Sequence, residues 1–118
     1  MTTNELKSRT QHFSLMIIEL VEKLPNSISV RVIANQIVKS GTSVGANYRA
    51  VCRARSDWEF VSKMNIVLEE ADETLFWIEI ITAKKWVNEK ELEIIWKEGN
   101  ELTAIFVSSL KTVNNRIN

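Results

Sequence analysis

Residues 40–50 read SGTSVGANYRA and contain two of the chain's three glycines, Gly41 and Gly45. A phosphate-binding loop needs a strand before its glycines and a Lys-Ser/Thr pair at its end. Here no strand-like alternation precedes the glycines, and Lys39 comes before both of them. Glycine inside a helix costs about 1 kcal/mol relative to alanine. We therefore interpret the stretch as the thin middle of a helix, against which another helix packs closely.

Apolar and small residues recur at alternating spacings of three and four in each quarter of the chain, which is typical of bundle helices. The spacing predicts helices over residues 4–24, 28–55, 57–85 and 89–115. The four stripes are Leu6, Thr10, Phe13, Ile17, Leu20 and Leu24; Val30, Ile33, Ile37, Ser40, Val44, Asn47, Val51 and Ala54; Val61, Met64, Leu68, Ala71, Leu75 and Ile78; and Leu92, Ile95, Gly99, Leu102, Phe106, Ser109 and Val113.

The junctions between these segments carry helix-capping residues. Ser56 and Glu59 have the spacing of a capping box, Asn88 is placed to cap the last helix, and Pro25 ends the first. The connections are short, so consecutive helices are expected to be antiparallel neighbours. The sequence therefore predicts one all-α domain over residues 1–118, an antiparallel up-down-up-down four-helix bundle.

Composition indicates a soluble, cytoplasmic protein with no membrane partner. Apolar runs are only a few residues long, far short of the roughly 20 that span a bilayer. The N-terminus lacks a signal-peptide pattern, and Cys52 alone can form no intrachain disulfide.

No catalytic or metal-binding pattern is evident in the sequence. His12 is the single histidine, and Arg9 stands three residues before it, where a di-iron bundle would need glutamate. Cys52 is expected to be a packed helix thiol. We therefore expect no enzyme activity, no catalytic residues, no metal and no cofactor.

Charge is distributed unevenly although the net charge is zero. Residues 28–56 carry five basic and no acidic side chains, whereas residues 57–85 carry three basic and seven acidic ones. One interpretation is solvated helix faces with weak ion pairs. The other is a basic patch of Arg49, Arg53 and Arg55 that binds phosphates or an acidic partner.

The second predicted helix has another stripe beside its core stripe, formed by Ala34, Val38, Gly41, Gly45, Tyr48 and Cys52. The third has apolar residues off its main stripe as well: Phe60, Val67, Trp77 and Ile81. Such an excess of apolar surface usually marks an interface. We therefore expect a homo-oligomer, with Gly41, Gly45, Tyr48 and Trp77 in helix packing or at the oligomer interface. Asn47, if buried, would need a hydrogen-bond partner and could fix helix register.

Three segments together resemble the signature of the bacterial 23S rRNA intervening-sequence proteins. They are SGTSVGAN at residues 40–47, SDWEF at residues 56–60 and LEEADETLFW at residues 68–77. The resemblance implies an antiparallel four-helix bundle without enzyme activity, assembled as a homo-oligomeric, pentameric ring. Related accessory proteins of diversity-generating retroelements bind nucleic acid through a strongly basic surface. This chain departs from them in its zero net charge, which leaves only the local patch, and it has Ala50 where many family members have glutamate.

Two main functional hypotheses follow. The first is a non-enzymatic oligomeric module that binds RNA or a ribonucleoprotein through the basic patch. The second is a protein-interaction scaffold without nucleic-acid binding, in which the arginines form ion pairs between helices or subunits. An enzyme that uses the acidic face of the third helix is the remaining alternative.

Overall fold

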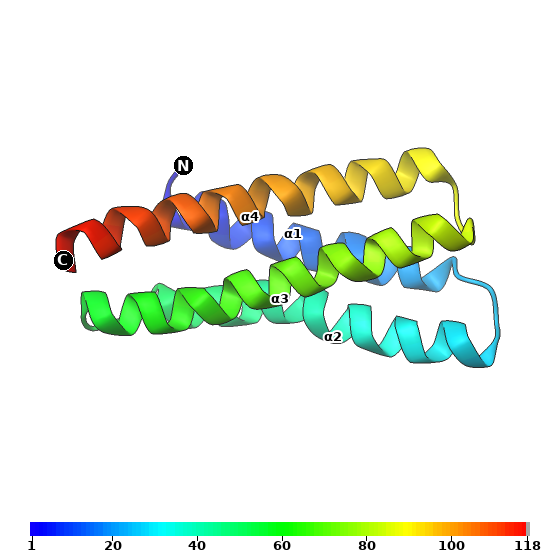
Figure 1. Cartoon of the computed structure of the whole chain (residues 1–118), viewed down its shortest axis with the longest axis horizontal. Coiled ribbons are helices and arrows are strands. Elements are labelled where there is room, and N and C mark those ends of the chain that lie inside the picture. The colour runs from blue at the N-terminus through cyan, green and yellow to red at the C-terminus, as the bar shows by residue number, and fades with distance from the viewer. Residues whose placement is uncertain (118) are drawn as a thin grey trace.

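The computed structural model describes residues 1–117, which form four α-helices and no strand. They are α1 (Thr3–Glu22), α2 (Ile28–Val51), α3 (Asp57–Lys84) and α4 (Glu89–Ile117). The molecule is a rod with extents of 47 × 23 × 23 Å. Figure 1 shows the chain reversing direction at each connection, so that both termini lie toward the end where α2 passes to α3. The all-α class with four helices is confirmed. None of the helices in residues 1–117 is long and apolar enough to cross a membrane.

Three of the four helices begin at a side-chain cap. The Thr2 and Ser56 hydroxyls accept hydrogen bonds from the N–H groups three residues later, at 3.1 and 3.0 Å, and Ser27 does the same for α2 at 3.2 Å. Asn88 Oδ1 accepts from the Lys90 N–H at 2.8 Å just before α4. These bonds satisfy N–H groups that the first turn leaves without a helical partner. The capping box at Ser56 is half formed. Its Glu59 carboxylate lies 3.6 Å from Arg55 Nε instead of accepting from the Ser56 N–H.

The second helix ends earlier than its spacing predicts. The prediction carried it to residue 55, but α2 ends at Val51, and Cys52 and Arg53 form a turn. The Cys52 and Arg53 N–H groups still bond to the Tyr48 and Ala50 carbonyls, as in a closing helical turn. Five residues are then left to reverse the chain into α3, and Arg55 lies in this connection.

The predicted stripes form the core. Each helix packs against two neighbours, α1 against α2 and α4, and α3 against α2 and α4, with α1 and α4 the least closely packed pair. Most stripe residues are buried, and the largest with no exposed surface are Phe13, Ile17, Leu20, Ile37, Ile78, Leu102 and Phe106. At the rims Leu24, Ile33, Asn47, Ala54, Val61, Leu68 and Ser109 are only half-buried.

Two residues expected to contribute surface to an interface are instead inside the bundle. Val67 and Ile81 on α3 have no exposed surface. Because α3 contacts both α2 and α4, it buries an arc wider than one stripe. The apolar side chains that α3 does expose are Trp58, Ile66 and Phe76.

A buried polar pair joins α2 to α3. The Thr74 hydroxyl lies 2.8 Å from the Ser40 hydroxyl and also donates to the Glu70 carbonyl at 2.7 Å. The pair places residues 40 and 74 at the same height along the bundle. Asn47 does not have the proposed register role, because its side-chain amide donates to the Ser43 carbonyl of its own helix at 2.8 Å.

Candidate functional site

A groove of about 500 Å³ runs between α1 and α2, lined by Lys7, Gln11, Ser14, Thr42, Gly45, Ala46, Arg49 and Arg53. Gly45, in its lining, lies close to the α1 backbone. A Cβ atom built on Gly45 would lie 3.3 Å from the backbone C and O atoms of Thr10, and one on Gly41 would lie 2.9 Å from Ile17 Cγ1. The two glycines therefore face α1 inside the chain, and Gly45 also lines the groove.

Three cationic side chains border this groove without an ion-pair partner. Arg49 lies in the last turn of α2, Arg53 lies in the turn that follows the helix, and Lys7 lies on α1; all three are exposed. Within residues 1–117, no carboxylate lies within 4.0 Å of their charged nitrogens. Unpaired cations around a concave surface attract anions, because their fields add there.

The structure separates Arg55 from the other two predicted arginines. Its side chain is 88% exposed in the connection between α2 and α3, and its Nε pairs with Glu59 at 3.6 Å. Arg55 does not line the groove, unlike Arg49 and Arg53. Sequence reasoning did not identify Lys7, Gln11 and Ser14. Each comes one position after a buried residue of α1, so their spacing of four and three could have indicated them.

Two hydroxyl groups also line the groove, and each donates its proton to a backbone carbonyl. Thr42 Oγ1 donates to the Val38 carbonyl at 2.7 Å. Ser14 Oγ donates to the Gly41 carbonyl at 3.1 Å, across the helix interface, with the Thr10 carbonyl at 3.2 Å. Toward a ligand these oxygens are therefore hydrogen-bond acceptors.

The other two predicted interface residues lie on different sides of the bundle. Tyr48 is buried and stacks on Phe106 of α4, with ring centroids 6.2 Å apart. Burial and the neighbouring Cys52 thiol raise the pKa of Tyr48 to about 12. Trp77 is half-buried on α3; its indole N–H donates to Glu73 at 3.3 Å, and its ring centroid lies 4.9 Å from that of Phe76.

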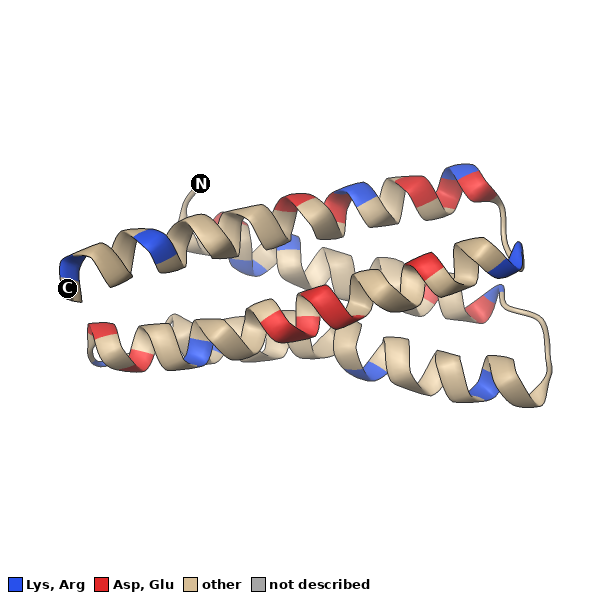
Figure 2. Cartoon of the chain, viewed as in Figure 1, with Lys and Arg blue, Asp and Glu red and all other residues tan. Residues whose placement is uncertain are grey.

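An acidic face lies on α3, formed by Glu69, Glu70, Asp72 and Glu73, and Figure 2 shows these residues near the middle of the helix. Burial and the nearby Glu73 raise the pKa of Glu70. Exposed Ile66 and Phe76 flank the face. Among residues 1–117, no group of three or more His, Cys, Asp and Glu side chains is placed to hold a metal ion.

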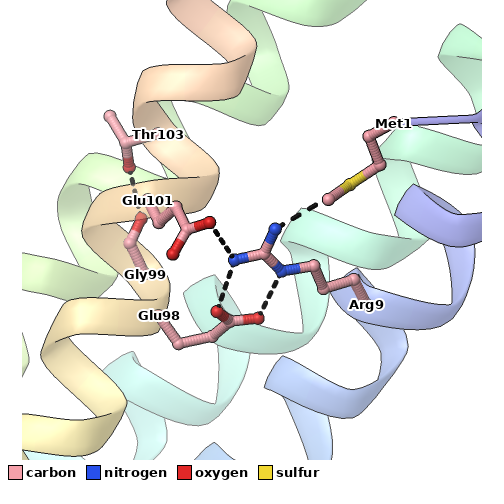
Figure 3. Close-up of polar contacts among 6 residues, drawn as sticks. All are labelled: Met1, Arg9, Glu98, Gly99, Glu101 and Thr103. Atoms are coloured by element: carbon pink, nitrogen blue, oxygen red, sulfur yellow. Dashed lines mark hydrogen bonds and ion pairs between the residues drawn. The ribbon is translucent and has the colours of Figure 1, made fainter.

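A third charged cluster links α1 to α4 through ion pairs (Figure 3). The Arg9 guanidinium donates to both carboxylate oxygens of Glu98, at 2.8 and 2.7 Å, and lies 3.0 Å from Glu101. These hydrogen bonds raise the pKa of Arg9 above its usual value. Since both Arg9 and Glu98 side chains are only 20% exposed, the cluster is a structural clamp and not a free cationic surface.

Comparison with known proteins places this architecture in a family. The family model of the 23S rRNA-intervening sequence protein matches residues 2–108. A crystal structure of a protein of unknown function from the S23 ribosomal protein family of Bacteroides thetaiotaomicron is 33% identical in sequence, with a TM-score of 0.83. That similarity covers 90% of this chain and 98% of the other. No curated protein is a match in sequence. The chain belongs to the 23S rRNA-intervening sequence protein family.

Proposed function

We propose that this protein is a non-enzymatic, homo-oligomeric RNA-binding protein whose α1/α2 groove holds the sugar-phosphate backbone. The observation that carries the proposal is the set of three cations, Lys7, Arg49 and Arg53, that border the groove without a carboxylate partner. Cations of this kind neutralise phosphates and release counterions, which supplies most of the sequence-independent affinity for nucleic acid. The S23 ribosomal family assignment of the structural neighbour agrees with an RNA or ribonucleoprotein partner.

Because the chain has zero net charge, its attraction for nucleic acid depends on where the charged side chains lie, and this favours the groove region. The acidic face of α3 repels phosphate, and α2 carries no acidic residue along its length (Figure 2). A nucleic acid is therefore attracted to the α1/α2 side of the bundle and not to the α3 side.

The experiment is fluorescence anisotropy of a labelled RNA hairpin at about 50 mM salt, where phosphate contacts are strong. The double variant Arg49→Glu/Arg53→Glu is expected to bind at least about tenfold more weakly than the wild type. The matched control Arg31→Glu/Lys111→Glu makes the same change in net charge away from the groove and should retain most of the affinity. An absence of RNA binding at low salt, or equal losses in both double variants, would contradict the proposal.

We further propose that the antiparallel up-down-up-down bundle is the protomer of a homo-oligomeric ring, with five copies as the expected number. Support comes from the apolar side chains that α3 exposes, among them Phe76 beside half-buried Trp77, since exposed apolar patches on soluble proteins usually mark an interface. Light scattering of the purified protein should give a mass five times that of the 13.6 kDa chain. A monomeric mass at micromolar concentration would contradict assembly.

The same apolar and acidic surface favours a second candidate function, a protein-interaction scaffold in which the arginines pair with carboxylates of neighbouring subunits. In that case Arg53→Glu changes the oligomeric mass or the stability. Light scattering and urea unfolding of this variant separate the two functions, because an RNA-binding role for Arg53 leaves both the mass and the stability unchanged.

A further inference from the structure

The hydroxyl groups of the groove restrict which chemical groups can face them. Thr42 on α2 and Ser14 on α1 both line the groove, and each hydroxyl proton is directed to a backbone carbonyl. A hydroxyl has one proton and two lone pairs, so while these carbonyl bonds persist the two oxygens accept from a ligand. Donation to a carbonyl also polarises the hydroxyl and strengthens it as an acceptor.

Phosphate oxygens are acceptors as well, so a bond from Thr42 or Ser14 to phosphate would break an existing hydroxyl–carbonyl bond. They are held by the donors at the border, Lys7, Arg49 and Arg53. A nucleic-acid backbone that places its phosphates on these cations must then present a donor to the acceptor oxygens. The ribose 2′-hydroxyl is such a donor, whereas DNA has only a C–H group at this position.

The small residues of the groove permit this approach. Gly45 and Ala46 add no long side chain between the two walls, so a sugar can come close to the helix surface. Gln11 also lines the groove, but its amide both donates and accepts and does not discriminate. We propose that the groove selects RNA over DNA by accepting a hydrogen bond from the 2′-hydroxyl at Thr42 and Ser14.

This inference rests on the proposed RNA-binding function and is tested with three hairpins of one sequence: RNA, 2′-fluoro RNA and DNA. The 2′-fluoro hairpin keeps the A-form shape but lacks the donor. Wild-type protein should bind RNA about two- to tenfold more tightly than the 2′-fluoro hairpin, the effect of one hydrogen bond. Thr42→Val is expected to reduce this preference, because the oxygen that accepts from the 2′-hydroxyl is removed.

Thr103→Val on α4 is the matched control. Its hydroxyl makes the same type of bond, to the Gly99 carbonyl at 2.8 Å, away from the groove (Figure 3). It should leave every affinity unchanged. The wild type could bind RNA and 2′-fluoro RNA equally, in a salt-dependent way, with both affinities lost in Arg49→Glu/Arg53→Glu. That result would overturn recognition of the 2′-hydroxyl and leave the proposed RNA-binding function in place. Failure of all three hairpins to bind at low salt would overturn both.

Discussion

Replacement of Gly41 by alanine tests whether the glycine stretch is there for close helix packing. An added Cβ would lie 2.9 Å from Cγ1, 3.0 Å from Cγ2 and 3.1 Å from Cβ of Ile17. These atoms belong to the stiff, branched part of a side chain with no exposed surface, so they cannot move aside easily. Overpacking of this kind costs about 1–3 kcal/mol.

Intrinsic helix propensity acts in the opposite direction. Alanine is favoured over glycine by about 1 kcal/mol inside a helix. Since three separate contacts fall well inside the van der Waals distance, we expect the steric cost to lie in the upper part of its range. The free energy of unfolding of Gly41→Ala should then fall by about 1–2 kcal/mol.

Urea unfolding followed by circular dichroism measures this difference. Ala46→Gly, at an exposed position of the same helix, provides the intrinsic propensity term alone and should lose about 1 kcal/mol. In a double-mutant cycle with Ile17→Ala, which removes both γ carbons, the combined loss should be smaller than the sum by about 1–2 kcal/mol. If Gly41→Ala were as stable as the wild type or more stable, the packing explanation of the stretch would be refuted.

Two other predictions concern polar groups. Arg9→Met should lower the free energy of unfolding, measured in urea, by about 1–2 kcal/mol, because it leaves a partly buried carboxylate unpaired. The control Lys97→Met breaks an exposed pair with Glu93 and should change that free energy by less than about 0.5 kcal/mol. Equal effects of the two variants would contradict the clamp. Tyr48 is the single tyrosine, so tyrosinate absorbance should titrate at about pH 12 in the folded protein. The unfolded chain ionises from about pH 10, so stability should fall between about pH 10 and 12 by up to roughly 3 kcal/mol, and Tyr48→Phe should lack that increment; titration of Tyr48 near its ordinary value would show that the ring is solvated.

Periodicity and caps were sufficient to predict the four helices, because each stripe alternates by three and four and each junction carries a capping residue. The core follows from the same rule, as the burial of Phe13, Ile37 and Phe106 shows. The end of α2 could not be predicted in this way. Val51 and Ala54 continue the spacing, but the reversal into α3 needs the intervening residues as a connection.

The candidate site was only partly predictable. Arg49 and Arg53 were indicated by a segment without acidic residues, but periodicity within one helix does not show which residues of another helix lie opposite. Lys7 and Ser14 join the groove only because α1 packs against the glycines of α2. Likewise, Val67 and Ile81 look surplus to a single stripe, and only the contact of α3 with two neighbours explains their burial.

The dependence of RNA affinity on salt tests the central claim most directly. If the groove cations contact phosphates, the logarithm of the association constant should fall linearly with the logarithm of the salt concentration. Each cation removed should reduce that slope by about 0.7–0.9 for every protomer that contacts the RNA. We predict this reduction for Arg49→Ala and Arg53→Ala and an unchanged slope for Arg31→Ala. A wild-type slope near zero, or equal slopes in all four proteins, would contradict the assignment of the α1/α2 groove as the RNA-binding surface.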